Sequence, residues 1–353
     1  MRIGEHMLER EIIEKALREE KLSKAEIMSL LSVTDSATTE QLFKAARDAR
    51  AKYFGNGVFL YGFVYFSTFC RNNCNFCFFR SANKDTMRYR KTSEEVREIA
   101  RGLADSGVHV LDLTMGEDPQ YHKEDFAGVL DLVAKIKEDN NLPVMISPGV
   151  VKDDLIEKFA KAGVEFYALY QETYNRELFK NLRINQDFEE RLHAKKYARK
   201  MGMHIEEGLM TGLGETVADL ADALLAMEDL NASQLRVMTF VPQEGTPMED
   251  METHNHDMEL KIIALIRLLY PKVLIPASLD VEGLDGLESR ILAGCNVVTS
   301  IIPPSTGLAG VAQSTMDVNE GKRSVAGVLP RLEKLGMRGA TVEEYKKWLI
   351  ENK

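Results

Sequence analysis

Two hydrophobic patterns divide the chain. Between residues 8 and 53, apolar side chains recur three and four positions apart, which is the period of an amphipathic helix. This stretch predicts two or three helices, and the turn residues 55–57 end it. From Val58 onward, short β-rich runs alternate with helical stretches. We expect strands at residues 58–67, 109–114, 144–147, 166–170, 203–209, 235–240, 273–279 and 297–302. We expect helices at 93–105, 125–138, 153–161, 187–200, 216–230, 257–269, 284–293, 325–335 and 341–350.

Eight repeats of a strand followed by a helix are typical of an α/β protein whose parallel sheet closes into a (β/α)8 barrel of the TIM type. We therefore expect an N-terminal helical segment at residues 1–57, a closed barrel at 58–320 and C-terminal helices at 321–353 that pack on the barrel. The alternative is a six-stranded partial barrel with an unrelated C-terminal domain, which would follow if two of the weaker runs were not strands.

Composition limits the partners that the protein can have. The 353 residues include 45 basic and 55 acidic side chains, a net charge of −10, and no basic block of the kind that follows a nucleic-acid backbone. The longest apolar stretches, 58–66 and 297–304, are about half the roughly 20 residues that a membrane-spanning helix needs. The first residues lack the basic and apolar regions of a secretory signal. We expect no nucleic-acid or membrane partner and a cytoplasmic location.

Three of the four cysteines lie directly after the first expected strand. Cys70, Cys74 and Cys77 form a C-x3-C-x2-C pattern at the end of a barrel strand where active sites are built. Three thiolates can hold three irons of a [4Fe–4S] cluster and leave the fourth iron open to another ligand. A structural zinc site is the alternative, but it needs four ligands, and no second cysteine pair is present. Cys295 is far away in the sequence, and we expect it to be a buried structural thiol.

The cysteine spacing, with the aromatic Phe76 before the last cysteine, resembles the signature of the radical S-adenosylmethionine (SAM) enzymes. The resemblance implies that the open iron binds the amino and carboxylate groups of SAM. It also implies that one electron cleaves SAM to methionine and a 5′-deoxyadenosyl radical, which removes a hydrogen atom from the substrate. A low-potential electron donor such as flavodoxin or ferredoxin is implied as a partner.

Residues after the second and third expected strands resemble parts of the SAM site in the biotin synthase and HydE branch of these enzymes. Gly116 and Glu117, directly after the second strand, resemble the glycine-glutamate motif that holds the methionine amino group. Ser147, at the end of the third strand, is a further expected contact with ribose or methionine. The resemblance therefore places these residues in the cofactor site.

The region after the fourth expected strand completes this resemblance. Glu172, followed by Arg183 and Arg191, resembles the glutamate and arginines that contact the ribose, amine or carboxylate of SAM in that branch. For the two arginines, an ion pair with Asp187 or Glu189 near a helix start is the structural alternative. For Glu172, a carboxylate at the C-terminal end of a barrel strand favours a functional role.

Nearly the whole chain resembles one group of radical SAM enzymes, the methylornithine synthase (PylB) family. The resemblance rests on the segments 65–70, 112–119, 145–149, 169–173, 236–240, 242–247 and 275–280. It implies an isomerase that converts L-lysine to (3R)-3-methyl-D-ornithine, the first step of pyrrolysine biosynthesis. The implied reaction removes a side-chain hydrogen, fragments lysine to a glycyl-type radical and an alkene amine, and recombines them at another carbon.

The residues themselves supply a site that suits lysine, which carries one carboxylate and two ammonium groups. Arg236, in the sixth expected strand, has a planar fork that can bind a carboxylate through two hydrogen bonds. Asp112 and Asp280 are carboxylates at the same level of the barrel, and Ser278 points the same way as Asp280 under the two-residue period of a strand. The alternative is that Asp112 and Arg236 merely pair with each other and neutralise a buried charge.

Two other functions remain open from the sequence. A HydE-like radical SAM enzyme acting on another small molecule would have the same cofactor half, and only the substrate residues would distinguish it. An iron–sulfur cluster carrier would also suit three cysteines, but it would not cleave SAM. Biotin synthase would need residues for a second cluster, and the chain has no second cysteine group.

Two further features look chemical, but we expect neither of them to take part in the chemistry. Residues 208–214 are rich in glycine without the spacing of a dinucleotide-binding loop, so we expect a turn there. His254 and His256 lie in an acidic loop, and we expect them to be solvated rather than to bind metal.

Overall fold

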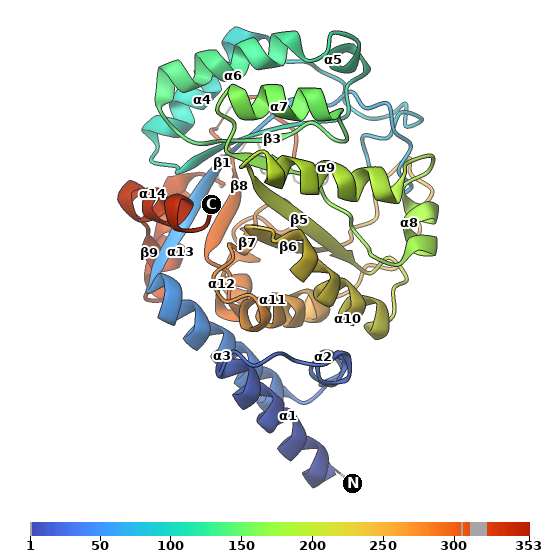
Figure 1. Cartoon of the computed structure of the whole chain (residues 1–353), viewed down its shortest axis with the longest axis vertical. Helices are drawn as coiled ribbons and strands as arrows, with labels where there is room; N and C mark the ends of the chain where they lie inside the picture. Colours follow the sequence, from blue (N-terminus) through green and yellow to red (C-terminus); the bar gives the residue numbers. More distant parts are fainter. Residues whose placement is uncertain (1, 305, 311–322) are drawn as a thin grey trace.

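The computed structural model describes residues 2–304, 306–310 and 323–353. The chain begins with three helices, α1 (Arg2–Leu17), α2 (Lys24–Leu31) and α3 (Ser36–Phe54). Ser23 starts α2 through a capping box with Glu26, and the Asp35 side chain accepts a hydrogen bond from the N–H of Thr38 at the start of α3. These blue helices lie at one end of the molecule in Figure 1. The prediction of a helical N-terminal segment is confirmed.

Eight parallel strands form the centre of the molecule. They are β1 (Gly57–Ser67), β2 (Val110–Met115), β3 (Val144–Ser147), β4 (Phe166–Ala168), β5 (His204–Thr211), β6 (Gln234–Thr239), β7 (Pro276–Ser278) and β8 (Val297–Ile301). Their order in the sheet is β6-β5-β4-β3-β2-β1-β8-β7. Since β7 and β8 belong to the same sheet as β1, the alternative of a partial barrel with an unrelated C-terminal domain is wrong.

Helices cover the outside of this sheet (Figure 1). They are α4 (Ser93–Asp105), α6 (Ala127–Asn140), α7 (Asp153–Lys161), α9 (Phe188–Lys200), α10 (Val217–Ala226), α11 (Asp257–Leu269), α12 (Leu287–Ala293) and α13 (Val325–Lys334), with a 3₁₀ turn η1 (Met227–Leu230) after α10. Three short elements were not predicted: α5 (Pro119–Lys123), α8 (Arg176–Leu182) and β9 (Arg338–Gly339). The outward strand residues and these helices share one large apolar core, which fixes the barrel.

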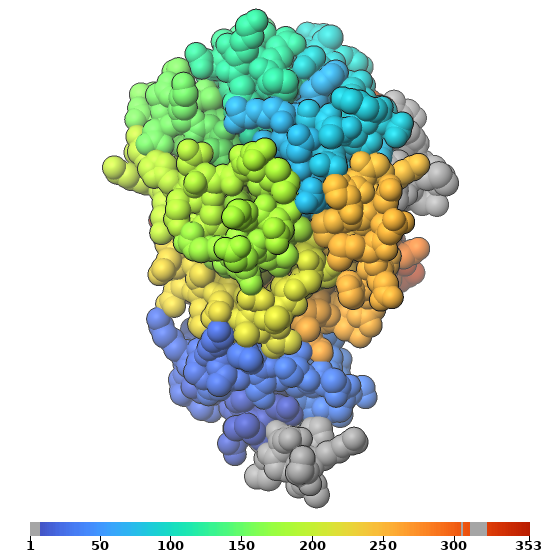
Figure 2. Space-filling model, turned by 90° about the vertical axis from the view of Figure 1, so that its right-hand side faces the viewer, coloured from blue at the N-terminus to red at the C-terminus, as the bar shows by residue number. Residues whose placement is uncertain are grey.

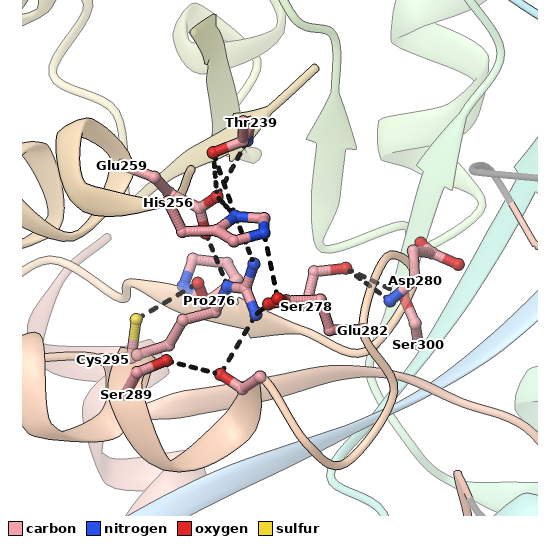
Figure 3. A network of polar contacts seen from close by, with 12 residues as sticks. Thr239, His256, Glu259, Pro276, Ser278, Asp280, Glu282, Ser289, Cys295 and Ser300 are labelled. Carbon is pink, nitrogen blue, oxygen red and sulfur yellow. Dashed lines mark hydrogen bonds and ion pairs between the residues drawn. The ribbon is translucent and has the colours of Figure 1, made fainter. Parts of the chain in front are cut away.

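The barrel closes between β6 and β7 with a single backbone bridge. Gln234 pairs with Leu274 at the N-terminal end of this seam, where the N–H of Leu235 donates to the carbonyl of Leu274 at 2.9 Å. Further along the seam, side-chain hydrogen bonds and ion pairs hold the elements together in place of backbone pairing. Glu259 of α11 accepts hydrogen bonds from the N–H and hydroxyl of Thr239, at 2.8 and 2.7 Å, and pairs with Arg290 of α12. Figure 3 shows this network from close by. The predicted closed barrel is confirmed as a nearly closed one.

His256 is part of the same network, so the expectation that it is solvated is wrong. Its ring lies between Glu259 and Glu282, at 3.1 and 3.0 Å (Figure 3). Hydrogen bonds to these two carboxylates raise the pKa of His256 to about 9. His254, in contrast, is exposed as expected. The charged imidazole therefore ties the loop after β7 to the start of α11.

Helix α14 (Val342–Glu351) seals the N-terminal end of the barrel. Its Tyr345 and Trp348 pack in one buried cluster with the strand residues Phe59, Tyr61 and Phe166. The hydroxyls of Tyr345 and Tyr61 lie 2.7 Å apart. Aromatic rings therefore fill this end of the barrel.

The expected domain limits fall partly outside what the structure covers. Helix α3 ends at Phe54 and β1 begins at Gly57, so a limit near residue 57 stays a prediction. The expected limit between 320 and 321 lies outside the described residues. In the described part of the chain, no helix is both long and apolar enough to cross a membrane.

Candidate functional site

A cavity of about 180 Å³ opens at the C-terminal ends of the strands. Its lining includes every residue that the sequence assigned to the cluster, the cofactor or the substrate, with the exception of Ser278. These residues are Cys70, Cys74, Cys77, Asp112, Gly116, Glu117, Ser147, Glu172, Arg183, Arg191, Arg236 and Asp280. The fold thus brings together, on one surface, residues that are up to 210 positions apart in the sequence.

The three cysteines lie in the loop that connects β1 to α4. Burial raises the pKa of the Cys70 thiol to about 11 and raises that of Cys77 further. Two donors point at the third thiol: Gln186 Nε2 lies 3.0 Å and Arg183 Nη1 lies 3.7 Å from Cys74 Sγ. At Cys70 and Cys77 burial disfavours the bare thiolate, whereas a thiolate bound to iron is stabilised by the metal charge. The loop therefore suits a bound cluster.

The alternative of a structural zinc ion finds no ligand set in this loop. Within the described ranges, no three His, Cys, Asp or Glu side chains come together closely enough to hold one metal ion. The cysteines of an iron–sulfur cluster instead bind separate irons. Cys295 is buried elsewhere, where its thiol donates to the carbonyl of Pro276 at 3.3 Å, so its structural role is confirmed.

Gly116 sits where any larger residue would collide with the cysteine loop. A Cβ at this position would lie 2.3 Å from the carbonyl oxygen of Phe69. The N–H of Gly116 donates to Ser67 at 2.8 Å, which holds the loop after β2 against the end of β1. The close approach requires glycine and leaves the backbone of this loop facing the cavity.

Glu117 forms a second close contact, with the loop after β3. A Cβ on Gly149 would lie 2.0 Å from Glu117 Cγ, so only glycine leaves room for this carboxylate. Glu117 pairs with Arg71 at 3.1 Å and with Arg191 at 3.6 Å. Ser147 ends β3 on the same wall of the cavity. This wall combines an exposed loop backbone, a hydroxyl and a carboxylate.

Glu172 lies in a left-handed backbone conformation, with φ at +67°, in the loop that follows β4. Its carboxylate pairs with Arg183 at 2.6 Å, and burial raises its pKa. Arg183 Nε is buried, and among the described residues it has no hydrogen-bond partner. A strained backbone and an unsatisfied buried donor at one place are typical of a functional site.

The two arginines do not pair with the acidic residues near the start of α9. Arg183 pairs with Glu172 instead, and Arg191 Nε donates to the carbonyl of Tyr170 at 2.8 Å. Glu189 pairs with Arg176. The structural alternative for Arg183 and Arg191 is therefore wrong, and both guanidinium groups reach the cavity.

A buried ion pair behind the fourth strand supports Glu172, and the sequence analysis missed it. Glu207 of β5 pairs with Lys195 of α9, and both side chains are fully buried. Glu207 Oε1 also accepts the N–H of Gln171 at 2.7 Å, one residue before Glu172. The signal in the sequence was two adjacent glutamates, Glu206 and Glu207, inside an expected strand. Such charges are rarely buried unless they are paired.

The opposite wall of the cavity is built around Arg236 of β6. Its Nε donates to Glu206 Oε1 at 2.8 Å, so it pairs with Glu206 and not with Asp112. Glu206 also accepts from Gln234 and from the hydroxyl of Tyr170, each at 2.8 Å. The alternative that Asp112 and Arg236 merely neutralise each other is wrong, and Glu206 is a buried partner of Arg236 that sequence reasoning did not find.

The two predicted aspartates differ in their partners. Burial, and then the charge of Glu206, raise the pKa of Asp112 to about 7, and its nearest donor is the hydroxyl of Thr114 at 2.9 Å. Asp280 pairs with the buried Arg323 at 3.0 Å and accepts from Ser300 at 2.8 Å. Asp112 therefore stands at a pKa where a cationic ligand can change its protonation.

Ser278 is buried next to this pair but does not line the cavity. Its hydroxyl lies 3.4 Å from that of Ser300 and accepts the N–H of Asp280 at 3.3 Å. Figure 3 shows Ser278, Ser300 and Asp280 together beside the seam network. In this geometry Ser278 supports the turn that carries Asp280.

The barrel, the three-cysteine loop and the charged cavity define the chain as a radical SAM enzyme, and a model of the Radical SAM superfamily matches residues 64–227. Enzymes of this class use a [4Fe–4S] cluster and SAM. The chain belongs to the 3-methylornithine synthase family within that superfamily, as the following similarities show.

The chain is 44% identical to a 3-methylornithine synthase of Methanosarcina acetivorans, over 94% of either protein. A crystal structure of methylornithine synthase (PylB) matches with a TM-score of 0.91 and 43% identity, covering 96% of this chain and 99% of that one. Identity to the [FeFe] hydrogenase maturase subunit HydE of Thermotoga maritima is 34%, over 85% of both proteins. The identity to the synthase is thus greater, and it extends over more of the chain, than the identity to the maturase subunit.

Proposed function

We propose that the protein converts L-lysine to 3-methylornithine in pyrrolysine biosynthesis, by a radical SAM isomerisation. The observation that carries this proposal is the set of charged groups that line the cavity together with the cysteines. Arg236, which is anchored by the buried Glu206, supplies a guanidinium group, and Asp112 and Asp280 supply two carboxylates. Lysine presents the complementary pattern, with one carboxylate and two ammonium groups. The similarity to 3-methylornithine synthases supports the same reaction.

Arg236 is the group that would bind the lysine carboxylate. Its Nε is engaged by Glu206, and among the described residues its terminal Nη1 and Nη2 donate no hydrogen bond. The guanidinium lies 5.6 Å from the ring centre of Tyr170, which limits its rotation. A planar fork held in this way binds a carboxylate with two parallel hydrogen bonds.

Asp112 and Asp280 would accept the two ammonium groups. Asp112 lies on β2 and Asp280 follows β7, so they approach the cavity from different strands. A bound ammonium favours the ionised form of Asp112 and lowers its pKa below the value of about 7 in the empty cavity. Asp280 is held by Arg323 and Ser300, which fix its direction.

The cofactor half of the cavity would be held by loop residues. Cys70, Cys74 and Cys77 would bind the cluster, and the backbone at Gly116 with Glu117 would face the amino group of SAM. Ser147, Glu172, Arg183 and Arg191 line the space where the rest of SAM would lie. When bound and reduced by one electron, this cofactor pair supplies a carbon-centred radical that abstracts a hydrogen atom.

The chain itself has to keep both fragments of the substrate in place while they recombine. The aromatic seal formed by Tyr345 and Trp348 closes one end of the barrel, and the cysteine loop covers the other. An enclosed site keeps reactive groups in the required geometry and excludes water. A low-potential electron donor, a flavodoxin or a ferredoxin, would be needed as a partner because the cluster must be reduced.

The test uses protein reconstituted with iron and sulfide in the absence of oxygen, supplied with dithionite, SAM and L-lysine. Lysine and methylornithine have the same mass, so chiral chromatography with mass detection separates them. We expect a new peak of unchanged mass that is absent with Cys74→Ala. Formation of 5′-deoxyadenosine with untouched lysine would contradict the substrate assignment. If a cluster-loaded protein gave neither product, the cluster-carrier alternative would replace the enzyme proposal.

A further inference from the structure

The loop between β1 and α4 has a charge opposite to that of the whole chain. Residues 68–92 carry six basic side chains and one acidic side chain, in a chain of net charge −10. Three of the basic groups pair with carboxylates of Glu117, Asp118 and Glu95. The other three, Arg80, Lys84 and Arg88, donate to backbone carbonyls, and no described carboxylate pairs with them. This surface therefore keeps positive charge that is not neutralised.

The segment that carries these basic residues lies outside the cysteines, and backbone hydrogen bonds connect it directly to the cysteine motif. The N–H of Arg80 donates to the carbonyl of Cys77 at 3.1 Å. The N–H of Ser81 donates to the carbonyl of Asn72 at 2.7 Å, between two of the cysteines. Since the inner side of the cysteine loop faces the cavity, an electron that reaches the cluster without crossing the substrate site has to pass through this outer layer.

Helix α8 extends the same basic surface. Asn75, inside the cysteine motif, donates from its side chain to the carbonyl of Asn181 at 2.7 Å. The neighbouring Lys180 is exposed and has no carboxylate partner among the described residues. Near the basic turn, Met87 is an apolar side chain with 60% exposure. The loop (blue to cyan) and α8 (lime) reach the face shown in Figure 2. An exposed apolar residue with charges around it is typical of a protein docking surface.

An acidic segment borders this surface on one side. Asn83 donates to the carbonyl of Glu244 at 3.0 Å, which joins the basic loop to residues 244–252. That segment carries the exposed side chains Glu244, Glu249, Asp250 and Glu252. An acidic partner would be repelled there, so its position is restricted to the side of α8.

We propose that Arg80, Lys84, Met87 and Lys180 form an electron-donor surface, which docks the acidic one-electron carrier protein that reduces the cluster. The inference rests on the proposed radical SAM function, and it adds where the partner binds and which charge it carries. One electron passes from the reduced cofactor of the carrier to the cluster, so the carrier is oxidised by one electron and no covalent bond changes. Opposite charges on the two proteins accelerate such an encounter.

The test compares two double charge reversals that change the net charge equally. Lys84→Glu with Lys180→Glu alters the electron-donor surface. The control, Lys334→Glu with Lys346→Glu, alters exposed lysines of α13 and α14, which have no carboxylate partner among the described residues. A flavodoxin in its hydroquinone form is the probe, and the readouts are its affinity for each protein and the rate at which the cluster absorbance bleaches at low ionic strength. Dithionite serves as the small reductant.

We expect the first pair to slow reduction by flavodoxin by about tenfold or more, with dithionite reduction and the control pair unchanged. The wild-type rate with flavodoxin should fall as salt is added, because screening shortens the range of the attraction. An unchanged flavodoxin rate in the first pair, or an equal loss in the control, would overturn the proposal. Bleaching needs neither SAM nor lysine, so failure of the lysine reaction would count against the proposed function alone.

Discussion

On the cofactor side of the cavity the charged groups stand on loops that follow the strands, whereas on the substrate side they stand on or close to the strands. Glu117 and Glu172 follow β2 and β4, and their carboxylates pair with arginines that come from other loops and from α9. Asp112, Glu206 and Arg236 lie within β2, β5 and β6. The loop-borne half suits a cofactor shared by many enzymes, while the strand-borne half is fixed by barrel register and, in the proposed function, would bind the substrate.

The largest effect should come from removing a cluster ligand. Cys74→Ala should abolish both 5′-deoxyadenosine and methylornithine, a loss of at least about a thousandfold, because the cluster is not retained. Iron content and product analysis measure it. The matched control is Cys295→Ala, which removes a buried thiol outside the cavity. Loss of the cluster in that control, with retention in the first variant, would contradict the assignment.

Arg236→Lys should impair the proposed substrate site and leave the cofactor site intact. A lysine cannot form the bidentate contact, and losing a buried charged hydrogen-bond pair costs about 2–5 kcal/mol, so kcat/KM for lysine should fall by about 30-fold to a few thousandfold. Cleavage of SAM in the presence of lysine should continue, with much less methylornithine formed per 5′-deoxyadenosine. Equal loss of 5′-deoxyadenosine and methylornithine would show that Arg236 serves the cofactor instead.

The pH dependence should report Asp112. If the ammonium of lysine needs the ionised carboxylate, kcat/KM should rise with pH through about 7 and change by about tenfold between pH 6 and pH 8. The sign follows from the raised pKa, since the carboxyl is neutral below it. Asp112→Asn should be less active and lack this step. SAM cleavage without lysine should not show the step in either protein.

Glu206→Gln tests a positioning role. Glutamine can still accept from Arg236 Nε, but it carries no charge, so we expect KM for lysine to rise by a few-fold to about tenfold with a smaller change in kcat. Because the charge of Glu206 raises the pKa of Asp112, the acidic limb of the pH profile should move to lower pH. A merely structural residue would leave that limb where it is.

The smallest effect concerns the seam behind Asp280. His256 has a folded pKa of about 9 against about 6.5 unfolded, so its stabilisation is complete below about pH 6.5 and is lost as pH rises through 9. His256→Gln should lower stability by about 1–2 kcal/mol at pH 6.5 and much less at pH 9.5. Thermal unfolding of the cluster-free protein at both pH values measures it. A loss that does not depend on pH would contradict the ion-pair role.

Most of the fold was visible in the sequence because each strand is a short apolar run between amphipathic helices. The eight expected strands all exist, and several helices, such as α4, α7 and α11, have the expected limits. The residues expected to hold the cofactor all line the cavity, although their role stays a prediction. The loose seam between β6 and β7 was not predictable, because it depends on which strand backbones meet across the barrel.

For the proposed substrate site, the sequence predicted the charged residues but not their partners. Sequence identifies charged residues in strands, but their partners depend on register between strands that are far apart in the chain. Arg236 pairs with Glu206 on the neighbouring β5 and not with Asp112 across the barrel, and Arg323 reaches Asp280 from beyond β8. Ser278 shares a strand face with Asp280, yet it is covered in the turn beneath it.

Deuterium transfer from uniformly deuterated L-lysine to 5′-deoxyadenosine tests the central claim most directly. It reports whether the radical formed near the cysteines abstracts a hydrogen atom from lysine that is held at Arg236. Wild-type protein should yield 5′-deoxyadenosine that contains deuterium, together with methylornithine, whereas Arg236→Lys should yield 5′-deoxyadenosine with little or none. Abundant 5′-deoxyadenosine without deuterium in the wild-type protein would contradict the account of the substrate site.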